Sequence, residues 1–96
     1  MYVRINTSVP KKESIEEAVT EWYDLTAPLK KDGLVEALLF LDREAPQFVS
    51  VTIWESREHQ QKNASSPAKQ GERQGWGRHL TSGPVSTHFE VASTVK

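Results

Sequence analysis

The sequence predicts an α+β fold in which four antiparallel strands and two helices follow one another in the order βαββαβ. Three observations carry this prediction: alternating apolar residues over 2–9, 48–54 and 85–92, an almost wholly apolar run over 34–42, and an amphipathic helical pattern that begins at Ser14. With right-handed crossovers, this order gives a four-stranded sheet covered by helices on one side, the ferredoxin-like arrangement. The chain has 96 residues, which corresponds to a single domain over residues 1–96.

The first helix has clear start and stop signals. It is expected to begin at Ser14, with Glu17 three residues later completing a capping box, and its apolar stripe includes Trp22. Pro28 should kink this helix or end its regular part. Gly33 is a suitable residue to follow the helix end, because glycine readily adopts the left-handed conformation found there.

The segment 57–83 is rich in Gln, Gly, Ser and charge, and it is expected to be either a poorly buried helix with breaks or a mobile flap. Ser56 can cap a helix that breaks near residues 65–67 and resumes to about Arg73. A turn at residues 83–84, Gly-Pro, then leads into the last strand.

The two faces of the predicted sheet differ in character. One face is apolar, with Val3, Ile5 and Val51 among its residues, and it suits packing against the helices. The other face is too mixed for a dry core and too aromatic for plain solvent, so it either faces a second copy of the sheet or lines a cavity. Its residues are Arg4, Asn6, Ser50, Thr52, Trp54, His88 and Glu90.

Composition and charge exclude several classes of function. The chain has 12 Lys and Arg against 13 Asp and Glu, a formal net charge of −1, and no basic stripe interleaved with aromatics, so we expect no nucleic-acid partner. There is no cysteine, which excludes disulfides, thiolate metal sites and cysteine nucleophiles. Because the sequence has no HExxH motif, facial triad or close histidine pair, we expect no metal.

The chain is also expected to stay out of membranes. Its start, MYVRINTSVP, lacks the apolar segment of a signal peptide, and the longest apolar run, residues 37–41, is far too short to span a bilayer. A cytoplasmic protein is therefore expected. Because a chain of 96 residues buries a modest core, pairing with a second copy would add stability.

Three short motifs on these elements resemble those of a known family. VRIN (residues 3–6) lies in the first strand, WES (54–56) ends the third strand, and FEV (89–91) lies in the last. In this order, and with the βαββαβ pattern, they resemble the antibiotic biosynthesis monooxygenase family of dimeric α/β barrels. The resemblance is clear over residues 2–58 and weak over 59–83.

The resemblance implies a homodimer whose two sheets close into one barrel, with a pocket between sheet and helices in each subunit. The family includes cofactor-independent oxygenases of aromatic polyketides and quinols, heme-degrading enzymes, and members with no known activity. The resemblance thus implies that the protein is a small monooxygenase that needs no cofactor. Its substrate would be an aromatic, polyketide or quinol-type compound. Two alternatives remain open: a non-catalytic ligand-binding or structural protein, and a polyketide cyclase or isomerase.

Two residues carry over from the family. Trp54 matches the pocket Trp of the polyketide oxygenases, although an Asn of that branch corresponds to Ser50 and a Tyr to a Gln. Asn6 matches an Asn on the first strand of the heme-degrading branch. The Trp and the heme-ligating His of that branch fall near Asn63 and near residues 72–73, so the iron ligand is missing.

Oxygenation without a metal begins when a phenol or enol loses a proton and the anion gives one electron to oxygen. This requires a dry pocket, an aromatic wall and a hydrogen-bond donor to the oxyanion. Trp54 is the predicted wall, Asn6 the predicted donor, and either His88 or a water the predicted base. The substrate-binding residues predicted beside them are Trp22, Arg4, Ser50 and Trp76.

Each of these residues also has a structural alternative. Trp54 and Trp22 can be packing residues, Asn6 can form a hydrogen bond across the barrel interface, and His88 can be an interface histidine. Trp76 lies between two glycines on a polar segment, which favours a lid or a dimer contact. The remaining expectations are a cross-strand pair of Arg4 with Glu90, and exposed positions for His59 and His79.

Overall fold

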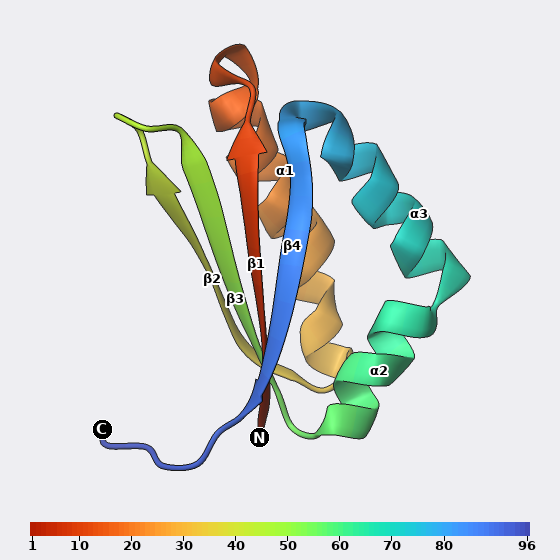
Figure 1. Cartoon of the computed structure of the whole chain (residues 1–96). Helices are drawn as coiled ribbons and strands as arrows, with labels where there is room; N and C mark the ends of the chain where they lie inside the picture. Colours follow the sequence, from red (N-terminus) through yellow and green to blue (C-terminus); the bar gives the residue numbers. More distant parts are fainter.

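The computed structural model describes residues 1–96 and has the predicted α+β, ferredoxin-like fold. Its four strands form one antiparallel sheet in the order β2-β3-β1-β4, and the helices lie together on one side of it (Figure 1). The strands are β1 (Tyr2–Pro10), β2 (Leu34–Asp42), β3 (Gln47–Trp54) and β4 (Leu80–Glu90). The helices are α1 (Ile15–Thr26), α2 (Arg57–Ser65) and α3 (Pro67–Trp76), with 3₁₀ helices η1 (Lys12–Ser14), η2 (Ala27–Asp32) and η3 (Gly77–His79). No helix is long and apolar enough to cross a membrane.

Helix α1 ends as predicted but begins differently. The predicted capping box is wrong: η1 precedes α1, the backbone of Ser14 is already helical, and its side chain forms no capping hydrogen bond. The regular helix stops at Thr26, and Pro28 lies in the first turn of η2. Gly33 then takes a φ of 98° and donates its backbone N–H to carbonyls of η2, so the predicted role of this glycine is confirmed.

The polar segment after β3 folds into two short helices joined at Ser66. Ser56 caps α2 as predicted, because its hydroxyl accepts the backbone N–H of His59 at 3.2 Å. Ser66 caps α3 in the same way, and α3 continues to Trp76, beyond the predicted end at Arg73. The segment is thus a broken helix and not a flap.

The predicted turn at Gly83-Pro84 is wrong, because β4 begins at Leu80 and runs through both residues. Its pairing with β1 shifts register between Thr7 and Pro10, which marks a bulge or irregularity. Strand β4 lies at the edge of the sheet. A proline lacks the N–H that pairs strands, and an edge strand tolerates it because one row of its N–H groups has no partner strand.

The helices cover the mixed face of the sheet, so the prediction that they pack on the apolar face is wrong. Phe48, from the mixed face, is 1% exposed and forms the small core with Ile15 and Ala18 of α1. The apolar face is left uncovered on the single chain. Its exposed residues include Leu38, Phe40, Val85 and Phe89. On β3 of this face, the large aromatics Phe48 and Trp54 flank the small polar residues Ser50 and Thr52.

Candidate functional site

A cavity of about 150 Å³ lies between the mixed face of the sheet and the helices α1 and α3. The structure brings six of the seven predicted site residues to its lining: Arg4, Asn6, Trp22, Ser50, Trp54 and Trp76. Of the two expectations for the mixed face, a second sheet or a cavity, the single chain therefore shows the cavity. A volume of this size accommodates about one aromatic ring.

Strand residues form one side of the cavity. Trp54 ends β3, is 2% exposed, and donates its indole N–H to the Thr52 hydroxyl at 3.1 Å. This hydrogen bond fixes the ring plane, so Trp54 is a packing residue and an aromatic wall of the cavity at once. Asn6 lies opposite Ser50 on β3 and opposite Ser86 on β4.

The Asn6 side chain is held by a short hydrogen-bond chain. Ser86 donates its hydroxyl to Asn6 Oδ1 at 2.5 Å, and the same hydroxyl accepts a longer bond of 3.4 Å from the Arg4 guanidinium. Since Arg4 can only donate, the Ser86 hydrogen is free for Asn6, which fits Oδ1 as the bonded amide atom. The amide NH₂ of Asn6 is left as a donor for a ligand oxygen.

Helix residues form the other side. Trp22 and Leu25 of α1 line the cavity together with Trp76 at the end of α3. Trp76 donates its indole N–H to the Ala18 carbonyl at 2.9 Å, and its ring lies 5.8 Å from that of Phe48. Trp76 is therefore anchored on the core, and the chain's three tryptophans all line the cavity.

Charged residues line the side of the cavity towards α3. They are Arg4, Lys69, Glu72 and Arg73. Arg73 donates to Asn63 Oδ1 at 3.0 Å and to the Ala64 carbonyl at 3.1 Å. Burial lowers the pKa of Arg4, and the neighbouring charge of Arg73 lowers it further. The pKa of Arg73 is also lowered, again chiefly by burial.

His88 lies outside this group, because it does not line the cavity. It is exposed on β4, where its ring stacks on Tyr2 with 5.9 Å between ring centroids. The predicted pairing of Arg4 with Glu90 is also absent: His88 lies opposite Arg4, and Glu90 lies opposite Tyr2. The C-terminal end of β4 thus carries exposed polar residues that do not line the cavity.

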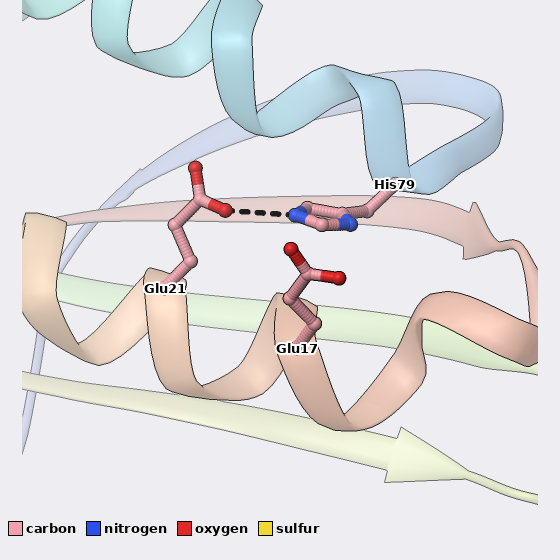
Figure 2. A group of neighbouring side chains, drawn as sticks. All are labelled: Glu17, Glu21 and His79. Carbon is pink, nitrogen blue, oxygen red and sulfur yellow. Dashed lines mark hydrogen bonds and ion pairs between the residues drawn. The ribbon is translucent and has the colours of Figure 1, made fainter.

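Figure 2 shows a second group of titratable side chains, formed by Glu17 and Glu21 on α1 and His79 in η3. The expectation that His79 is exposed is wrong: it is 2% exposed, with Nε2 at 2.8 Å from Glu21 Oε2. Arg78 donates to both oxygens of Glu21, at 2.6 and 2.8 Å, and lies 3.7 Å from Glu17. The pKa of Glu21 falls from 4.5 to about 2, first through the Arg78 hydrogen bond and then through that from His79.

These donor types suit a divalent cation, but the guanidinium of Arg78 is already paired with both carboxylates. The group is best described as an ion-pair cluster that joins η3 to α1. None of the cluster's residues lines the cavity, although the adjacent Gly77 does.

The sequence did not single out Lys69, Glu72 and Arg73 as ligand-binding residues, although residues 72–73 mark the place of a heme-ligating His. The α2–α3 segment has no apolar stripe from which an inward face can be read, and the break at Ser66 resets the helix direction. Heme does not fit this lining, because none of the three histidines contributes to it.

Comparison with known proteins identifies the fold and the family. Rv0793 from Mycobacterium tuberculosis superposes with a TM-score of 0.80 at 17% identity, covering 99% of this chain and 98% of that one. SnoaB, a cofactor-independent oxygenase from Streptomyces nogalater, gives 0.76 at 15% identity, covering 98% and 95%. A conserved protein from Methanosarcina mazei Go1 gives 0.77 at 12% identity, covering 93% and 91%.

No curated protein matches the chain in sequence. The family model of the antibiotic biosynthesis monooxygenases, however, matches residues 1–75, which include β1, the Trp54 motif and most of α3. Together with the fold, this match shows that the chain belongs to the antibiotic biosynthesis monooxygenase family.

Proposed function

We propose that this protein is a cofactor-independent monooxygenase that acts on a small quinol. The observation that carries the proposal is the cavity, in which Asn6 and Trp54 lie beside Trp22 and Arg4 within about 150 Å³. The volume favours a single-ring quinol over a polycyclic polyketide, since it holds about one aromatic ring. Membership of the monooxygenase family supports the reaction class.

The proposed reaction balances with the quinol as the only reductant. The quinol loses one O–H proton, and its anion transfers one electron to O₂, which leaves a semiquinone radical and superoxide. The two combine to form a C–O bond at a ring carbon, and the resulting hydroperoxide loses water. A hydroquinone and O₂ thus yield a hydroxyquinone and H₂O, and the four electrons taken up by O₂ come from the ring.

The cavity residues favour the anionic states of this sequence. The rings of Trp54 and Trp22 hold the substrate ring and exclude water, while the Asn6 amide donates to the oxyanion. Because His88 lies outside the lining, water is the proposed acceptor of the proton.

We also propose that two chains form a homodimer through the apolar face of the sheet. Exposed side chains of Leu38, Phe40, Val85 and Phe89 extend from one edge strand to the other and lack a covering layer. A contiguous apolar surface of this kind on a small domain is typical of a protein interface. The cytoplasmic location expected from the sequence stays a prediction.

Oxygen uptake tests the reaction. With a hydroquinone substrate in metal-free buffer, the wild-type protein should consume O₂ faster than the no-protein control. Asn6→Ala should lower kcat about 100-fold, because it removes a donor to the oxyanion. Trp54→Phe keeps an aromatic ring but loses area and the Thr52 bond, so a loss of about tenfold or less is expected.

Tyr23→Phe is the control, because Tyr23 is 66% exposed on α1 and does not line the cavity. Its rate should equal that of the wild type.

His88→Ala separates the two proposed bases: an unchanged rate supports water, whereas a large loss assigns the proton transfer to His88. Uptake no faster than the no-protein control over a series of quinols would favour the rival function, a non-catalytic ligand-binding protein.

A further inference from the structure

The charges in the cavity are unbalanced. Three cationic side chains line it, those of Arg4, Lys69 and Arg73, against the single carboxylate of Glu72. That carboxylate is exposed and lies 3.5 Å from the Lys69 ammonium. The two arginines therefore face the cavity without an acidic partner, although the chain as a whole carries a formal net charge of −1.

Arg4 has few contacts for a half-buried guanidinium. Its one hydrogen bond is the 3.4 Å contact with the Ser86 hydroxyl, and its Nε is buried with no partner at all. An unpaired buried donor of a charged group is costly, and natural proteins seldom keep one without a ligand, an ion or an ordered water to satisfy it. The Nε atom marks a place where an acceptor is missing.

Arg73 faces the same space from α3. Its hydrogen bonds go to the neutral oxygens of Asn63 and Ala64, and the carboxylate that acts on its charge is that of the exposed Glu72. Repulsion from the positive charge of Arg73 also contributes to the lowered pKa of Arg4. A bound anion would relieve both the repulsion and the missing acceptor.

A second hollow beside the cavity extends the positive region towards solvent. It shares Asn63 and Lys69 with the cavity. Its further cationic residues are Lys30, Lys31 and Lys62, against the carboxylates of Asp32 and Glu55. Cations at the entrance of a cavity raise the local concentration of anionic ligands and speed their association.

We infer that the ligand is an aromatic carboxylate, whose carboxylate group is held by Arg4 and Arg73 while its ring lies among Trp22, Trp54 and Trp76. The planar guanidinium fork matches a carboxylate better than a neutral oxygen. Resting on the proposed function, this inference narrows the substrate to a single-ring quinol that bears a carboxylate.

A quinol without a carboxylate would not balance these charges. Phenolic hydroxyls ionise near pH 10, so such a ligand enters the cavity neutral at pH 7 and becomes anionic only during the reaction. A carboxylic acid ionises near pH 4 and carries its charge on entry. A ligand that is already anionic when it binds therefore matches the two arginines better than one that becomes anionic only during the reaction.

Binding of a matched pair of ligands tests the inference. The probes are 2,5-dihydroxybenzoate and its neutral amide, 2,5-dihydroxybenzamide, titrated anaerobically by calorimetry at pH 7. The carboxylate should bind at least about tenfold more tightly than the amide, and the difference should shrink at high salt. Because all three tryptophans line the cavity, fluorescence quenching gives an independent readout.

Arg4→Met and Arg73→Met should each weaken binding of the carboxylate about tenfold and leave amide binding within about twofold of the wild type. Arg57→Met is the matched control, because Arg57 is exposed and does not line the cavity, and it should bind both probes as the wild type does. Equal binding of carboxylate and amide to the wild-type protein overturns the inference, even where a variant fails to fold.

The same probes separate this inference from the oxygenase proposal. Selective binding of the carboxylate without O₂ uptake upholds the anion site and rejects the oxygenase. Uptake with hydroquinone and the amide at the same rate as with the carboxylate upholds the oxygenase and rejects the anion site.

Discussion

Among single residues, Gly33 holds a position that a larger side chain cannot share. Its φ of 98° lies in the left-handed region, and a Cβ built there would overlap the His59 ring. Gly33→Ala should therefore destabilise the protein by more than the roughly 1–2 kcal/mol that a left-handed conformation costs an L-residue. Urea unfolding followed by circular dichroism measures the difference.

Gly71→Ala is the control for this substitution. Gly71 lies inside α3, and a Cβ there would meet nothing within 4 Å. Alanine should stabilise the helix by about 0.5–1 kcal/mol, because glycine loses more backbone entropy on folding. Similar destabilisation by both substitutions would show that the conformation at Gly33 is not what makes it irreplaceable.

Residue-level prediction succeeded where the chemistry of a residue matched its place on a strand. Asn is uncommon within strands, and Asn6 accordingly lies in the cavity. Arg73 gave no such signal, because an arginine on a polar helix is ordinarily solvated. His79 was misjudged for a related reason: its burial depends on Glu21, which is 58 residues earlier in the chain.

At the level of elements, the ion-pair cluster joins η3 to α1, and its contribution to stability should depend on pH. The Glu21 carboxylate has a pKa of about 2 in the folded chain against an ordinary 4.5, so it binds protons less readily folded than unfolded. A lowered pKa stabilises the fold above about pH 4.5, and this stabilisation is lost as the pH falls towards about 2.

Replacing Glu21 by Gln tests this dependence. The difference in free energy of unfolding between wild type and Glu21→Gln should be largest above pH 4.5 and should shrink as the pH falls towards 2. Glu13→Gln is the control, because Glu13 is exposed and forms no ion pair. A difference that stays constant from pH 7 to pH 2 would mean that Glu21 contributes through its shape and not its charge.

Element prediction worked where a local rule acts alone and failed where tertiary contacts decide. The β2 span, the end of α1 shortly before Pro28 and the Ser56 cap all follow from short-range chemistry. The start of β4 does not, because pairing with the end of β1 extends the strand through Gly83-Pro84. The break at Ser66 was predictable, whereas the inward direction of α3 was not.

At the level of the whole molecule, the two faces of the sheet exchange their expected roles. An apolar face is ordinarily the one that helices cover, and that reasoning holds for a domain that buries one core. Here the helices enclose a small cavity on the mixed face, and the apolar face stays uncovered. A sheet that lines a cavity with one face has its other face free for a second apolar layer, and in the proposed homodimer a second copy supplies that layer.

Two substitutions that are matched for exposure test the proposed dimer. Leu38 on the apolar face and Val19 on α1 are 37% and 36% exposed, so a lysine costs each site about the same in the single chain. Leu38 lies in the row that continues through Val51 and Ile5. Sedimentation should give twice the mass of one chain for wild type and Val19→Lys, and the mass of one chain for Leu38→Lys. A lysine at Leu38 that leaves the larger mass intact would mean that the chains associate through another surface, since a charge buried between two sheets costs several kcal/mol.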